Sequence, residues 1–440
     1  MRKNLYLCCL PSWTRKSEIR WGACGMSEWT WKIIDDLGQI VTGKTPSTKC
    51  PEYWDGDIPF ITPKDIQGTK HCEKTERYIT NAGSLSAGKV MLGRDAVCVS
   101  CIGNIGYVAM TTQNSVTNQQ INSIVVNDDH SNDYVYYLMK NLWGYFKTCE
   151  SQGTSVPILS KSLFSQIPVF VPTIALQRKI SAVLSVLDNK IELNHRLNDN
   201  LEAMAQALYD YWFVQFDFPD DNGKPYKSSG GKMVWNDRLK REIPEGWSAQ
   251  PLFDVASVLY GYPFKTELFT ENEKDLPVIR IRDILDNTFS AYSSEPIHGK
   301  YLTQKGDLLI GMDGNFHLNY WHRDGDGVNQ RVVRIRSCTS TLSNIQLKLE
   351  LAPYIKMREM NVTRSTVGHL GDKDFKERYI VVAPETSTFN PAKALNALLE
   401  RMSSLVAETQ KLTKQRDFLL PLLMNGQVQV KPLNYRLTAD

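Results

Sequence analysis

Apolar residues recur every seventh position between Pro172 and about Phe216, in two interleaved series. The first series is Ile180, Leu187, Asn194, Leu201 and Leu208, and the second is Leu184, Ile191, Asn198, Ala205 and Trp212. This 3.5-residue period is typical of a coiled-coil seam rather than of a globular core stripe. It predicts a helix of about 40 residues, roughly 60 Å long, that needs a partner helix.

A second stretch with the same period lies near the C-terminus, from Pro391 to about Gln427. Its two series are Leu395, Met402, Thr409 and Arg416, and Leu398, Leu405, Leu412 and Leu419. Polar residues in each seam cost stability and fix the register. We expect the two helices to pair antiparallel within one chain. Pairing between chains and two ordinary core helices stay open as alternatives.

The segments that precede the two helices match each other in order. Each begins at a Trp-led apolar segment (Trp29 and Trp247) and continues through a Gly turn, a strand ending in Asp-Ile and an Asn-Gln step. The offset is 218 residues for Asp65 and Asp283, 211 for Asn118 and Asn329, and 212 for Pro172 and Pro384. A nearly constant offset over several segments indicates internal duplication.

The expected fold class is therefore α+β, with two similar mainly-β domains joined by two long antiparallel coiled-coil helices as a tandem repeat. A helix near Tyr134–Lys147 is expected in the first copy. We expect an extension at 1–25, domain 1 at 26–172, a helix at 173–218, a linker at 219–244, domain 2 at 245–386, a helix at 387–430 and a tail at 431–440. We interpret 1–25 as disordered or as the product of an upstream start site.

Composition narrows the class of protein only slightly. The chain has 440 residues, 42% of them hydrophobic, and a net charge of +3, so nucleic-acid binding would depend on local charge. It lacks an apolar run of membrane-spanning length. Its nine scattered cysteines indicate a reducing compartment, and we expect the cytoplasm. Cys98 and Cys101 form a lone CxxC in an apolar run and are interpreted as strand residues.

No catalytic or metal-binding constellation emerges from the sequence. Gly38–Thr45 matches the phosphate-loop pattern, but its interior is β-branched and Pro46 disfavours a helix opening at Thr45. Asp55, Asp57, Lys64 and Asp65 lack the Glu-x-Lys step of a nuclease. His195, His298, His317, His322 and His369 lack metal-ligand spacing. We expect no catalytic residue, no metal and no cofactor in this chain.

Polar loops carry the chemistry that suits DNA. Their Lys and Arg residues can hold phosphates, and their Asn, Gln and Arg residues can read base edges. In the first copy the candidates are Lys44, Thr45, Ser47, Thr48, Lys64, Lys70, Asn118, Gln119, Thr154 and Ser155. In the second copy they are Lys265, Arg280, Arg282, Asn329, Gln330, Arg331, Thr363, Arg364 and Ser365, with Arg334 and Arg336 close by. Ordinary solvated loops, and an Asn-Gln step that bonds its own turn, are the alternatives.

These motifs resemble the specificity subunit of type I restriction–modification enzymes. The resemblance rests on GKTPST (43–48), DIPFITPKDI (57–66), VTNQQI (116–121), GTSVPILSKSLFSQIPVFVP (153–172) and the QRKI opening of the first helix (177–180), and it extends from Trp29 to about Val430.

The resemblance implies that each domain reads one half of a bipartite double-stranded DNA target. The helices would set the gap between the half-sites and carry two modification (methyltransferase) subunits, which restriction (translocase-nuclease) subunits then join. S-adenosylmethionine would belong to the modification subunits, and ATP and Mg to the restriction subunits. A coiled-coil scaffold without base reading, or the recognition part of a fused restriction enzyme, is the alternative.

Two further expectations concern affinity and bases. The arginines of the second copy predict at least one guanine contact in its half-site. The small net charge predicts weak binding by the isolated chain and tight binding once modification subunits contribute phosphate contacts.

Overall fold

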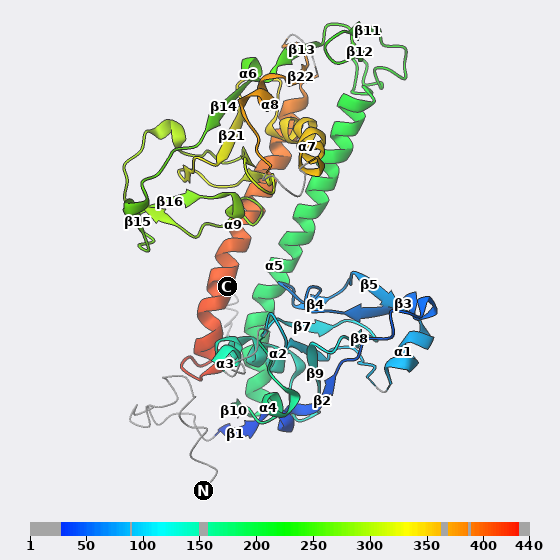
Figure 1. The fold of residues 1–440 in the computed structure, drawn as a ribbon, viewed down its shortest axis with the longest axis vertical. Coiled ribbons are helices and arrows are strands. Elements are labelled where there is room, and N and C mark those ends of the chain that lie inside the picture. Colours follow the sequence, from blue (N-terminus) through cyan, green and yellow to red (C-terminus); the bar gives the residue numbers. More distant parts are fainter. Residues whose placement is uncertain (1–27, 89, 149–156, 362–367, 386–388, 431–440) are drawn as a thin grey trace, which may run out of the picture. The chain divides into compact units, whose positions relative to one another are not determined.

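The computed structural model describes residues 28–88, 90–148, 157–361, 368–385 and 389–430 (Figure 1). The chain forms two compact units. Unit 1 runs to Glu192 and resumes at Leu412, and unit 2 runs from Leu193 to Lys411. The expectation for residues 1–25 lies outside the described residues.

Unit 1 is built from short strands around two small sheets. The five-stranded sheet has the order β2 (Gly38–Thr42), β9 (Ile121–Val126), β6 (Val97–Ser100), β7 (Val108–Thr111), β4 (His71–Cys72), and the three-stranded sheet β5 (Arg77–Ile79), β3 (Trp54–Ile61), β8 (Val116–Thr117). The helices are α1 (Asn81–Ala87), α2 (Asn132–Asn141), α3 (Trp143–Thr148) and α4 (Lys161–Ser165). The helix expected near Tyr134–Lys147 is present as α2 and α3.

Unit 2 repeats this plan. Its two four-stranded sheets are β14 (Ala256–Tyr260), β21 (Val332–Ser337), β18 (Asp307–Gly311), β19 (Leu318–Trp321), and β15 (Phe269–Thr270), β17 (Tyr292–Ser293), β16 (Leu276–Ile279), β20 (Gly327–Val328). The helices are α6 (Leu252–Val255), α7 (Asn344–Met360) and α8 (Asp372–Lys376). In each unit one antiparallel strand pair leads into a long helix: β1 (Trp29–Ile33) with β10 (Pro168–Pro172), and β13 (Ser248–Pro251) with β22 (Tyr379–Val382).

The duplication extends to the strand register. Phe60 of β3 pairs in parallel with Val116 of β8, and Val278 of β16 pairs in parallel with Gly327 of β20. The offsets are 278 − 60 = 218 and 327 − 116 = 211, which are the offsets seen in the sequence. The fold class predicted from the sequence is confirmed.

The two seven-residue repeats form two long helices, α5 (Ile174–Tyr209, 36 residues) and α9 (Pro391–Met424, 34 residues). Helix α5 begins directly after β10 because Gln177 anchors its first turn. The buried Gln177 amide accepts from Ser131 N at 3.0 Å and donates to Pro172 O at 2.9 Å. The helix ends in a π-helical turn at Asp210–Val214, short of the predicted Phe218.

Each unit holds one end of both helices, and the helices run antiparallel in each. In unit 1, Arg416 Nη1 donates to Asp188 Oδ1 at 2.9 Å, and in unit 2, Asn194 Nδ2 donates to Glu408 Oε2 at 2.8 Å. Seam residues on the two helices are buried or half-buried; they are Ile180, Leu184, Leu187, Ile191, Leu201, Leu208, Leu395, Leu398, Met402, Leu405, Leu412 and Leu419. Eight of them pack in the cores of the β domains: Ile180, Leu184, Leu201, Leu208, Leu395, Leu398, Met402 and Leu419. The helical spacers are thus part of the domain cores rather than free rods.

The segment predicted as a linker contains an ordered hairpin, formed by β11 (Met233–Asn236) and β12 (Arg241–Pro244). Its Ile243 is buried in the core of unit 2 and its Met233 packs against that core, and aromatic residues on either side of the hairpin stack on one another. Phe218 stacks on Tyr226 and on Trp247, each with ring centres 4.8 Å apart. The Gly, Lys and Ser content of residues 219–244 predicted a linker, because it gave no sign of these long-range contacts. None of the helices within the described ranges combines the length and apolar character needed to cross a membrane.

Candidate nucleic-acid interface

Three loops of unit 1 meet where strands β2, β3 and β8 end. Lys44 N donates to Thr117 O, and Asn118 N donates to Ile61 O, both at 2.9 Å. The loop after β2 and the loop after β3 are therefore both bonded to the Asn-Gln turn after β8. We name this set of segments (residues 43–49, 62–65 and 117–120) the loop cluster of unit 1.

A glycine makes this approach possible in each copy. A Cβ on Gly43 would lie 2.1 Å from Asn118 O, and one on Gly261 would lie 2.0 Å from Asn329 O. Since real Cβ atoms do not come that close, only glycine fits there. Unit 2 thus has an equivalent loop cluster, formed by residues 261–266, 280–283 and 328–331, in which Tyr262 N donates to Val328 O at 2.7 Å.

The loop cluster of unit 1 exposes several predicted side chains. Lys44, Ser47, Thr48 and Gln119 are exposed, and Thr45 is half-buried and donates through Oγ1 to Gln119 Oε1. Lys64 is exposed, but its ammonium donates to Glu76 Oε2 at 2.9 Å. This hydrogen bond and the Glu76 charge raise the pKa of Lys64 above its ordinary value. Lys44 is therefore a better phosphate ligand than Lys64.

Lys70 is a correction to the predicted site. Its side chain is only 5% exposed, and Nζ lies 2.6 Å from Asp133 Oδ1 and 2.9 Å from Ser185 Oγ on α5. The ammonium also lies over the Tyr137 ring, 5.2 Å from its centre. Lys70 therefore fastens the β domain of unit 1 to α5 and is not available to a phosphate.

Asn118 is the second correction. It is buried, its amide donates to Gln120 Oε1 at 2.9 Å, and its Oδ1 accepts from Gln120 N at 3.0 Å. Both bonds lie within its own turn, so Asn118 shapes the loop, as the structural alternative held. Thr154 and Ser155 lie outside the described residues.

Unit 2 carries more arginine in the corresponding loops. Lys265, Arg282, Gln330 and Arg331 are exposed, and Arg280 and Asn329 are half-buried. Arg331 Nη1 lies 3.1 Å from Asp313 Oδ2, and Arg282 Nη2 donates to Ser290 Oγ at 3.0 Å. These contacts orient both guanidinium groups and leave them at the surface. Thr363, Arg364 and Ser365 lie outside the described residues.

Arg334 and Arg336 are structural, contrary to the suggestion that they contribute to reading guanine. Buried Arg334 donates from Nη1 to Lys300 O at 3.0 Å and Leu302 O at 3.2 Å. Arg336 forms a two-pronged bond with buried Asp307 at 2.6 and 2.7 Å. Both side chains cross-link the domain interior.

One exposed arginine of unit 1 escaped the sequence analysis. Arg77 on β5 places its guanidinium carbon 3.4 Å from the centre of the Trp54 ring, and Trp54 Nε1 donates to Ser47 O at 3.1 Å. Arg77 therefore adjoins the loop cluster through one indole ring. Arg77 and Trp54 are 23 positions apart in the sequence, so no local sequence pattern could predict the contact.

Other candidate chemistry is absent from the described ranges or is structural. Gly38–Thr42 is strand β2, so the phosphate-loop pattern does not form a loop leading into a helix. Cys98 and Cys101 are buried free thiols in and after β6, and burial raises the pKa of each to about 11. His195 is exposed on α5, and the described residues contain no cluster of three or more potential metal ligands.

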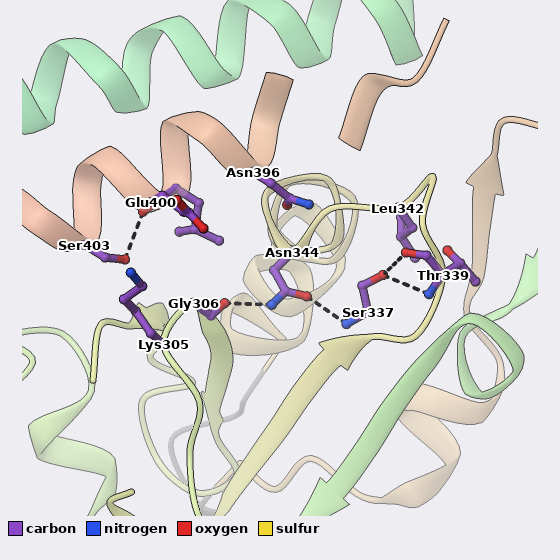
Figure 2. Close-up of a pocket in the computed structure, with 10 residues that line it drawn as sticks. Lys305, Gly306, Ser337, Thr339, Leu342, Asn344, Asn396, Glu400 and Ser403 are labelled. Carbon is purple, nitrogen blue, oxygen red and sulfur yellow. Dashed lines mark hydrogen bonds between the residues drawn. The ribbon is translucent and has the colours of Figure 1, made fainter. Parts of the chain in front are cut away.

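A polar pocket of about 280 Å³ lies in unit 2 between the end of β21 and helix α9 (Figure 2). Asn344 at the start of α7 spans its floor, donating to Gly306 O at 2.7 Å and accepting from Ser337 N at 2.8 Å. These bonds join the start of α7 to Gly306 and to the end of β21, whereas the buried Thr339 hydroxyl in the lining has no hydrogen-bond partner within the described residues. It includes none of the loop-cluster residues.

The structure defines a class of protein in which two similar mainly-β domains are joined by two long coiled-coil helices. A family model described as the type I restriction modification DNA specificity domain matches residues 26–203. This match confirms the resemblance of the chain to specificity subunits of type I restriction enzymes.

Individual relatives extend the likeness to the second copy. The MjaIX specificity subunit of Methanocaldococcus jannaschii is 28% identical over 425 residues, covering 92% of this chain and 95% of that protein. The HindI specificity subunit of Haemophilus influenzae is 35% identical over 187 residues, covering 41% of this chain and 40% of that protein. The solved type I S subunit from M. genitalium shares the fold, with a TM-score of 0.53, 17% identity and coverage of 90% and 96%.

Proposed function

We propose that this chain is the non-catalytic DNA specificity subunit of a type I restriction–modification complex. Each loop cluster reads one half of a bipartite double-stranded DNA target. The observation that carries the proposal is that one loop architecture is built twice, around Gly43 and Gly261, and bears different exposed side chains in each copy. Similar scaffolds with different surface chemistry suit two different half-sites.

Helix α5 offers a surface for the modification subunits. Within unit 2, Leu193, Leu197 and Met204 are 49%, 36% and 53% exposed. Their spacings of four and seven residues place them on one face of the helix, separate from the buried seam. An apolar stripe exposed to this degree suits a protein partner. S-adenosylmethionine would then be bound by the modification subunits, and ATP and Mg by the restriction subunits.

The charge distribution supports a division of labour with these partners. Lys70, Arg334 and Arg336 are used internally, and Lys64 is paired with Glu76. Fewer of the candidate cations are therefore left to neutralise phosphates, so the isolated chain should bind its site weakly and with a shallow salt dependence. Comparing DNA affinity with and without modification subunits tests this. Equal affinity in the two states would contradict it.

Methylation mapping tests the function directly. The chain would be co-expressed with the methyltransferase encoded beside its gene, and modified adenines would be located across the host genome. We expect a two-part motif with a fixed non-specific gap. Methylation of a continuous motif would contradict half-site reading by two domains.

A further inference from the structure

Arg77 is held in one place at the rim of the unit 1 loop cluster. Its guanidinium carbon lies 3.4 Å from the centre of the Trp54 ring. The indole is itself fixed: Trp54 is 8% exposed, donates to Ser47 O at 3.1 Å, and meets Phe60 edge-on with ring centres 5.3 Å apart. Arg77 also pairs with Phe60 across β5 and β3.

The donors of this guanidinium are unused. Within the described residues, no hydrogen bond or ion pair to the Arg77 side chain is formed, and its guanidinium lies over the Trp54 ring. Lys64, in the same loop cluster, is instead paired with Glu76. A guanidinium stacked on a ring keeps its N–H groups in its own plane, pointing past the ring edge.

We propose that Arg77 determines one base of the half-site read by unit 1, by donating two parallel hydrogen bonds to the O6 and N7 edge of a guanine. This inference rests on the proposed function. A planar fork held rigid by stacking suits a base edge, whereas a phosphate contact requires only charge.

The second copy has no arginine at the position that corresponds to Arg77. Val278 corresponds to Phe60 at the offset of 218, and Val278 N donates to Ala291 O at 2.9 Å. Ala291 therefore stands at the position of Arg77, and its methyl side chain has no hydrogen-bond donor. The guanine assigned to Arg77 belongs to one half of the target only.

The test compares three variants of the full chain with wild type, each co-expressed with the modification subunit and mapped by genome-wide methylation. Arg77→Ala removes the fork, and Arg77→Lys keeps the charge without the fork. Arg94→Ala is the matched control, because Arg94 is an exposed arginine of the same unit, paired only with Asp95 at 3.7 Å. The thermal midpoint of each variant is measured alongside.

Both Arg77 variants are expected to relax one guanine position in one half-site, by about 5- to 150-fold in discrimination. The other half-site should be unchanged, and Arg94→Ala should behave as wild type. If Arg77→Ala does not fold, Arg77→Lys carries the test alone. An unchanged motif in Arg77→Lys overturns the inference, as does a uniform loss of binding to all sequences that lysine restores. A wild-type protein without a two-part motif refutes the proposed function instead.

Discussion

At the scale of single residues, charge in unit 1 is used mainly for internal fastening. Tyr137 donates its hydroxyl to Asp188 Oδ2 at 2.7 Å, and Asp188 also binds Arg416 of α9. Lys70 joins the same region through Ser185 and Asp133. This network ties the β domain to both long helices, so its members should affect stability before they affect DNA binding.

Two lysines of unit 1 separate these roles. Lys70→Met should lower the free energy of unfolding by about 1–2 kcal/mol, because Asp133 and Ser185 lose a partner. The thermal midpoint should fall accordingly. Lys70→Met should leave the DNA sequence preference intact.

Lys44→Ala should leave the thermal midpoint unchanged and reduce the salt dependence of DNA binding by about one phosphate contact. Thermal unfolding and DNA titrations at several salt concentrations measure both effects, and a reversed pattern would contradict the assignment.

His322 predicts an acid sensitivity of unit 2. Ser403 donates its proton to Leu399 O, so it accepts from His322 Nδ1 at 2.8 Å, and the ring is buried and neutral. Burial, assisted by the Lys348 charge, lowers the pKa of His322 from 6.5 to about 4. Because the unfolded chain then binds the extra proton, stability should fall as pH drops from 6.5 towards 4, by about 2 kcal/mol at pH 5.

The thermal midpoints of wild type and His322→Gln at pH 7 and pH 5 measure this contribution. The substitution should flatten the pH dependence, and His195→Gln, at an exposed position of α5, should not. An undiminished acid loss in His322→Gln would show that another group is responsible.

The sequence could not identify these residues because their partners are distant in the chain. Lys70 looked like a loop cation until the fold brought Asp133 and Ser185 to it. Asn118 looked like a base reader, although the Asn-Gln step already offered the alternative that the structure supports. Arg77 was missed because its value depends on Trp54 and Ser47, which other elements supply.

At the scale of elements, periodicity in the sequence was sufficient to predict the two long helices and the duplication. The seven-residue repeats predicted α5 and α9, and the offsets of 218 and 211 predicted a duplication that recurs in the strand pairs β3–β8 and β16–β20. The hairpin β11–β12 was not predictable, because its Met233 and Ile243 pack in the core of unit 2, which distant segments supply.

The polar residues of the helix seam are expected to lower stability and to fix the register of the two helices. Asn194 is 1% exposed; Nδ2 bonds Glu408, whereas Oδ1 has no hydrogen-bond partner. Asn194→Leu should therefore raise the thermal midpoint, and it should weaken the preference for one helix register. Calorimetry and the mass in solution measure the two effects. A lower midpoint with an unchanged mass in solution would contradict this role for Asn194.

The exposed stripe of α5 predicts the effect of added charge. Leu197→Glu with Met204→Glu should reduce binding of the modification subunit at least tenfold, because two charges enter an apolar contact. DNA binding by the isolated chain should not change. Ala203→Glu, at an exposed position off the stripe, is the control. Equal loss in the control would remove the stripe from the interface.

At the scale of the whole molecule, each compact unit contains one β domain and one end of both long helices. This arrangement should make each β domain replaceable, because its strand pair, β1–β10 or β13–β22, precedes a long helix to which both units contribute. The central claim is that each domain reads its own half of the target independently.

Replacing residues 29–172 by the corresponding domain of a relative with a different target tests that claim most directly, with genome-wide methylation as the readout. The account predicts a hybrid motif in which one half changes while the other half and the gap stay the same. A change in both halves, or an unchanged motif, would contradict it.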